Sequence, residues 1–142
     1  MRILIFTLFC LLTTPALAAV RATDAWAPPS LAGSRTGIAY VTLESERADA
    51  LIAASSPAIG IIELHEHTHA DGVVKMRKRE SIPLPEATPV TLAPRGLHLM
   101  LFQLKAPLKD GTSFPLTLRF SDSEPVTLTV VVSQQKLLDF LR

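Results

Sequence analysis

Residues 60–79 read GIIELHEHTHADGVVKMRKR, and this stretch decides the fold. Asp71-Gly72 is typical of two-residue hairpin turns, because both central residues of such a turn need a positive φ. The segments on either side, Gly60 to His69 and Val73 to Arg79, have the length of strands, and in the first of them the residues after Ile61-Ile62 alternate in character. The stretch therefore predicts a β-hairpin.

The rest of the chain shows the same kind of pattern. Short apolar runs rich in Val, Ile, Leu, Thr and Phe lie between prolines and glycines, which is typical of an antiparallel sandwich or barrel. Prolines at 83, 85, 89 and 94 break one segment into short pieces. We expect a short C-terminal helix over Ser133–Arg142. The further strands that we expect are Val20–Trp26, Thr36–Leu43, Asp49–Ser55, Val90–Leu92, Leu97–Leu104, Phe114–Phe120 and Val126–Val132.

The first 18 residues, MRILIFTLFCLLTTPALA, have the features of a secretory signal peptide. One positive charge precedes an apolar run too short for a comfortable membrane span, and the segment ends in Ala16-Leu17-Ala18. We expect cleavage after Ala18, which leaves residues 19–142 as one domain. Cys10 lacks a small residue before it, so we do not expect it to be lipidated, and residues 19–142 contain no cysteine.

The charge and the motifs exclude several functions. Removing Arg2 leaves 13 basic and 13 acidic residues, and this balance argues against nucleic acid or a membrane surface as partner. The chain has no Gly-x-Ser-x-Gly motif and no phosphate loop, so we expect no enzyme. His65-Glu66 and His69 match the zinc-protease pattern His-Glu-x-x-His, but that chemistry needs a helix, whereas this segment is predicted to be a strand.

Every histidine of the chain, and every methionine except Met1, lies between residues 65 and 100. Thioether sulfur is a poor ligand for zinc, calcium or magnesium and a good one for Cu(I), and imidazole also binds copper. The clustering of these two residue types therefore indicates a Cu(I) site. The residues concerned are His65, His67, His69, Met76, His98 and Met100.

Strand geometry relates these side chains to one another. His98 and Met100 are two residues apart, about 6.6–6.8 Å along a strand, and point to the same side. If Asp71-Gly72 is the whole turn, His67 lies opposite Met76 and His65 lies diagonal to Met76 on the same face. The register therefore leaves both His65 and His67 as candidates for the histidine ligand of the hairpin.

The spacing His65-x10-Met76-x21-His98-x-Met100 resembles the signature of the PCu(A)C periplasmic copper chaperones. Flanking segments such as TGIAYVTLES and HLMLFQLKAPLKDGTSFPLTLRF extend the resemblance over most of the chain after residue 18. It implies a cupredoxin-like, Greek-key β-sandwich that holds one Cu(I) through His65, Met76, His98 and Met100. Among the remaining histidines, His67 and His69 are accessory candidates, since a His-x-His pair suits Cu(II).

The resemblance also implies a periplasmic carrier that passes copper on by ligand exchange. Its acceptor would be the CuA site in subunit II of cytochrome c oxidase, with a thioredoxin-like assembly factor as a further partner. We expect the carrier to be a monomer with no membrane contact after signal cleavage. Two alternatives stay open: a copper buffer or resistance protein without an oxidase partner, and a β-sandwich interaction module that binds no metal.

Overall fold

The structure is a computed structural model that describes residues 19–142. The predicted signal peptide, residues 1–18, lies outside the described residues, and its cleavage stays a prediction. The described chain consists of β-strands and one short C-terminal helix, so the predicted all-β class is confirmed. In chain order the elements are β1 (Val20–Ala27), β2 (Thr36–Ser45), β3 (Asp49–Ser55), β4 (Ile59–Ala70), β5 (Val73–Arg79), β6 (Ile82–Leu84), β7 (Val90–Thr91), β8 (Leu97–Leu104), β9 (Ser113–Phe120), β10 (Val126–Val132) and α1 (Gln134–Leu141).

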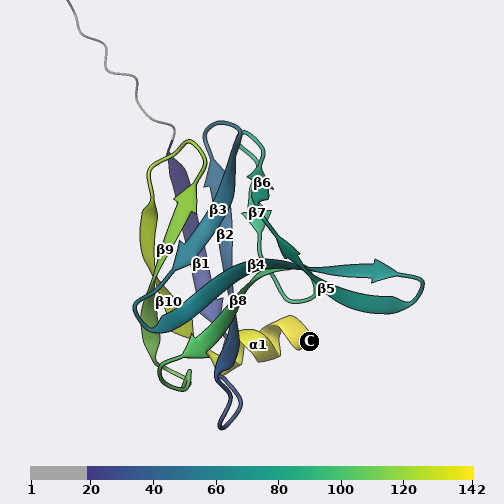
Figure 1. The fold of residues 1–142 in the computed structure, drawn as a ribbon, viewed down its shortest axis with the longest axis vertical. Coiled ribbons are helices and arrows are strands. Elements are labelled where there is room, and N and C mark those ends of the chain that lie inside the picture. Colours follow the sequence, from purple (N-terminus) through teal and green to yellow (C-terminus); the bar gives the residue numbers. More distant parts are fainter. Residues whose placement is uncertain (1–18) are drawn as a thin grey trace, which may run out of the picture.

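The strands form one continuous sheet in the order β5-β4-β8-β2-β1-β10-β9-β3-β6, and β7 pairs with β2. β2 takes part in both layers, because its first half pairs with β8 and its second half pairs with β1 and β7. The sheet thereby folds over on itself, and β4 and β8 cross the strands β1 and β2 in the view of Figure 1. All strand pairs are antiparallel except β1 and β10, which are parallel. The sequence did not predict this parallel pairing.

Alternate residues of the strands fill the core between the two layers. On β8, Leu99 and Leu101 are fully buried, and on β9, Leu116 and Leu118 are equally buried. Their neighbours in sequence lie on the opposite face of each strand, as the period of two in a strand requires. One face of β8 is therefore anchored in the core, which fixes the direction of the side chains on its other face.

Two elements lie at the periphery: the strand β6, which the sequence did not predict, and the helix α1, which it did. β6 was not predicted because Pro83 cannot donate to a sheet. Pro83 is tolerated because β6 is an edge strand that pairs with β3 alone. Its neighbours Ile82 and Leu84 are buried. The predicted C-terminal helix forms as α1, where the Ser133 hydroxyl accepts a hydrogen bond from the Lys136 amide at 3.2 Å. Among residues 19–142, no helix is both long and apolar enough to cross a membrane.

The β4–β5 hairpin extends away from the sandwich (Figure 1). Asp71 and Gly72 form its turn with φ values of 51° and 71°, both positive as the Asp-Gly pair predicts. His67 lies opposite Met76 in the observed register, which confirms the predicted pairing. β5 is an edge strand with all its residues exposed, so one strand of the candidate site faces solvent.

Candidate metal centre

The predicted ligands lie on one face of the three strands β5, β4 and β8. Three cross-strand pairs define this face: His67 with Met76, His65 with His98, and Glu63 with Met100. Residues that are directly paired in a sheet point to the same side. The residues between them, such as Leu64 and Leu99, point into the core. We call this outer surface, made of these six side chains, the ligand face.

His98 is the most deeply placed of these side chains, with 1% of its surface exposed. Its Nδ1 lies 3.0 Å from the carbonyl oxygen of Gly96, which can only accept a hydrogen bond, so Nδ1 carries the proton. Burial lowers the pKa of His98, which keeps the ring neutral at neutral pH. The lone pair is therefore on Nε2, and this nitrogen is buried with no hydrogen-bond partner.

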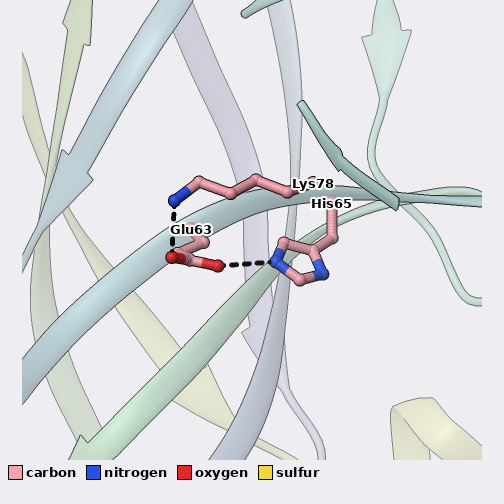
Figure 2. A network of polar contacts seen from close by, with 3 residues as sticks. All are labelled: Glu63, His65 and Lys78. Atoms are coloured by element: carbon pink, nitrogen blue, oxygen red, sulfur yellow. Dashed lines mark hydrogen bonds and ion pairs between the residues drawn. The ribbon is translucent and has the colours of Figure 1, made fainter. Parts of the chain in front are cut away.

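His65 makes its hydrogen bond through the other ring nitrogen, Nε2. Its Nε2 lies 2.9 Å from Oε2 of Glu63, whose other oxygen accepts a hydrogen bond of 2.6 Å from Nζ of Lys78 (Figure 2). The hydrogen bonds from Lys78 and His65 lower the pKa of Glu63, so Glu63 is ionised and acts as an acceptor. Nε2 of His65 therefore carries the proton, and Nδ1 is buried without a partner. A neutral His65 thus presents a free lone pair on Nδ1.

His67 lies beside His65 and His98, whereas His69 lies apart from them. The centroid of the His67 ring lies 4.7 Å from that of His98, and the His65 and His98 rings are 5.8 Å apart. Nδ1 of His67 is also buried and unpartnered. His69 is exposed near the turn and pairs with Val74, so it does not join the other three rings. The geometry keeps both His65 and His67 as candidate ligands.

The two methionines approach the histidines from opposite ends of the ligand face. Met76 is 45% exposed and lies level with His67 on the edge strand β5. Met100 is half-buried, lies level with Glu63 on β8, and borders a hollow of about 210 Å³ beside the loop after β1. β4 lies between the strands that carry them, so their flexible side chains have to converge over this strand to reach one ion.

This arrangement fits a soft metal better than a hard one. Within residues 19–142, no group of three or more His, Cys, Asp or Glu side chains is arranged to hold a metal ion. The thioethers are neutral, soft donors and the unpartnered ring nitrogens are neutral donors that also bind copper, so the set suits Cu(I). The segment His65 to His69 lies on strand β4, as predicted, and so lacks the helix that the zinc-protease motif requires.

Sequence reasoning missed three groups that orient these rings, namely Glu63, Lys78 and the carbonyl of Gly96. Glu63 precedes His65 by two residues on one strand, which places both on one face, and this spacing was the available signal. The role of Lys78 can be recognised only from the hairpin register, in which Lys78 lies opposite His65. The role of Gly96 depends on the path of the chain before β8 and had no local signal.

Comparison with known sequences gives the family. The family described as "LpqE-like: Putative lipoprotein LpqE-like" matches residues 20–132, which is most of the chain. The chain belongs to the LpqE-like family. It is 32% identical over 114 residues to "Putative lipoprotein Lxx21020" of Leifsonia xyli subsp. xyli, covering 80% of this chain and 69% of that protein. It is 34% identical over 125 residues to the uncharacterized protein RP573 of Rickettsia prowazekii, covering 84% and 69%.

Solved structures show the same fold as this LpqE-like protein. The copper-bound PCuAC domain from PmoF2 matches with a TM-score of 0.67 at 23% identity, covering 83% of this chain and 95% of that domain. The Cu(I) form of DR1885 from Deinococcus radiodurans matches with a TM-score of 0.64 at 26% identity, covering 87% and 82%. The fold of the LpqE-like chain is thus that of PCuAC domains.

Proposed function

We propose that this LpqE-like protein is a copper carrier that binds one Cu(I) through His65, Met76, His98 and Met100. The observation that carries the proposal is the pair of buried, unpartnered nitrogens, Nδ1 of His65 and Nε2 of His98, on a face that also holds both methionines. Buried polar atoms without partners are uncommon, and imidazole nitrogens on one face with two thioethers are a donor set that suits Cu(I). Copper in two of the structural neighbours supports the choice of metal.

Carriage and release follow from the same ligands. Two neutral imidazoles and two thioethers leave the site with a charge of +1 when Cu(I) is bound, and they disfavour Cu(II), which prefers nitrogen and oxygen ligands. Met76 is the exposed ligand on an edge strand, so an incoming acceptor displaces it first. Thiolate ligands on the acceptor then draw Cu(I) away because they are softer donors. The protein performs no catalysis in this cycle.

The destination of the copper is proposed from the resemblance alone. We propose the CuA site of cytochrome c oxidase subunit II as acceptor, with a thioredoxin-like assembly factor assisting, and the periplasm as compartment. The description of the family as lipoproteins supports a place outside the cytoplasm. A transfer assay from the Cu(I)-loaded protein to the isolated soluble domain of subunit II tests this step. Copper transfer is expected; retention of copper by the carrier favours a buffer.

Anaerobic titration of residues 19–142 with Cu(I) against a competing chelator tests the site itself. One tight equivalent is expected, and Met76→Leu and Met100→Leu should each weaken it at least tenfold because each removes a sulfur donor. His69→Ala is the matched control, since His69 lies apart from the other rings, and it should bind Cu(I) like the wild type. Tight binding that is indifferent to both methionine substitutions would contradict the proposed ligand set.

A second pair of variants decides between the two histidines of β4. His65→Ala is expected to abolish tight Cu(I) binding, while His67→Ala is expected to lower the affinity only modestly. The physical reason is that His65 is directly paired with His98 and is held in place by Glu63, whereas no side-chain hydrogen bond holds His67 in the described chain. The reverse order of effects would assign His67 as the ligand.

A further inference from the structure

We propose that Glu63 is a positioning residue that holds His65 as its Nε2–H tautomer, so that Nδ1 is the nitrogen offered to the metal. This inference rests on the proposed function and adds what orients the ligand. The hydrogen bond between Glu63 and His65 spans 2.9 Å, and the second nitrogen of the ring points away from Glu63 (Figure 2). A carboxylate paired with a ligand histidine fixes both the tautomer and the orientation of the ring.

Both oxygens of Glu63 are already engaged, which separates it from a metal ligand. Oε2 accepts from His65 and Oε1 accepts from Lys78 at 2.6 Å, on the neighbouring strand. The side chain of Glu63 is 25% exposed and that of Lys78 is 63% exposed, so the contact between them lies toward solvent. Glu63 therefore acts on the site through His65, and Lys78 holds Glu63 in the orientation that this contact needs.

The two histidines are consequently fixed in opposite tautomers. The carbonyl of Gly96 holds the proton of His98 on Nδ1, while Glu63 holds the proton of His65 on Nε2. The free lone pairs are then Nε2 of His98 and Nδ1 of His65, two of the three ring nitrogens on the ligand face that are buried without partners; the third is Nδ1 of His67. The two hydrogen bonds, one to the Glu63 carboxylate and one to the Gly96 carbonyl, are the main support for the assignment.

Glu66 provides a matched control on the same strand. It lies on the opposite face of β4, and its Oε2 accepts a hydrogen bond of 2.9 Å from Arg79 of β5. Its side chain is 32% exposed, close to the value for Glu63. Replacing either glutamate removes one ion pair between β4 and β5, but only Glu63 contacts a candidate ligand. Differences between the two variants thus report on His65 rather than on the hairpin.

The test combines long-range 1H–15N spectra of the histidine rings in the metal-free protein with Cu(I) competition titrations. In the wild type, His65 is expected as the Nε2–H tautomer and His98 as the Nδ1–H tautomer. Glu63→Leu should leave His65 as a mixture of tautomers and lower the Cu(I) affinity about 10- to 100-fold. Glu66→Leu should keep both tautomers and bind Cu(I) within about twofold of the wild type.

Several outcomes would overturn the inference. These are an Nδ1–H tautomer of His65 in the wild type, an unchanged tautomer in Glu63→Leu, or equal losses of affinity in Glu63→Leu and Glu66→Leu. Glu63→Gln serves if the leucine variant does not fold, because it keeps an acceptor oxygen; it should retain the tautomer with a smaller loss of affinity. Absence of tight Cu(I) binding in the wild type would instead refute the proposed function, while the metal-free spectra still decide the tautomer.

Discussion

Replacing His98 by phenylalanine tests whether the site is maintained at a cost in stability. Nε2 of His98 is buried and unpartnered, and such an atom costs about 1–3 kcal/mol. The substitution also removes the hydrogen bond to Gly96, which contributes about 1 kcal/mol. The Gly96 oxygen keeps a donor, because the amide of His67 also reaches it at 3.2 Å. The metal-free His98→Phe protein should therefore be more stable than the wild type by about 1 kcal/mol.

Chemical and thermal denaturation with and without Cu(I) under anaerobic conditions measure this prediction. A gain of about 1 kcal/mol corresponds to a rise in Tm of roughly 4 °C for a protein of this size. Cu(I) at a hundredfold excess over its Kd should stabilise the wild type by about 2.7 kcal/mol and leave His98→Phe unchanged. The order of stability of the two proteins should thus reverse when copper is added.

The control for this experiment is His69→Phe, at the exposed end of β4. It introduces the same side chain away from the other rings and should change neither the stability nor the response to copper by a measurable amount. A metal-free His98→Phe protein less stable than the wild type by more than about 1 kcal/mol would refute the reasoning. That result would mean that Nε2 of His98 is satisfied and that no cost is associated with the site.

Three further predictions concern the scaffold. Leu99→Ala should lower the free energy of unfolding by about 2–5 kcal/mol in urea denaturation, because Leu99 is fully buried behind the ligand face; a loss below 1 kcal/mol would contradict this packing. Gly72→Ala should cost about 1 kcal/mol, since Gly72 has a φ of 71°, and Ala70→Gly at the neighbouring strand end serves as a comparison for the backbone at the turn. Asp49→Asn should cost about 1 kcal/mol at pH 7 because Asp49 accepts hydrogen bonds from three backbone amides. Burial opposes ionisation of Asp49, but these hydrogen bonds outweigh burial and lower its pKa. The stabilisation is therefore complete above the unfolded value of about 3.9 and disappears as the pH falls through the folded pKa, so the difference between wild type and variant should vanish in acid; a difference independent of pH would argue against it.

Local sequence signals predicted much of this fold. The strands Asp49–Ser55, Val73–Arg79, Leu97–Leu104 and Val126–Val132 have the predicted bounds, because turn residues border them: Ser56, Gly72, Gly96 and Pro125, respectively. The hairpin register was also predicted, since Asp71-Gly72 determines it locally. The parallel pairing of β1 with β10 was not predicted, because it joins segments from the two ends of the described chain.

The sequence predicted which residues make up the candidate site, but it predicted their arrangement only in part. The parity of β8 placed His98 and Met100 on one face, and the hairpin placed His65 and His67 beside Met76. The pairing of His65 with His98 depends on the association of β4 with β8, which no local signal specifies. The hydrogen bonds that orient the rings depend on the same pairing, so Glu63 and Gly96 were missed for this reason.

X-ray absorption spectroscopy of the Cu(I)-loaded protein tests the central claim most directly. The copper edge reports the oxidation state, and the extended fine structure counts the sulfur and nitrogen atoms bound to the metal. The proposed ligand set of His65, Met76, His98 and Met100 predicts Cu(I) with two sulfur and two imidazole nitrogen neighbours. A spectrum that contains nitrogen or oxygen neighbours alone, with no sulfur, would contradict the account and assign the histidines to a different kind of metal site.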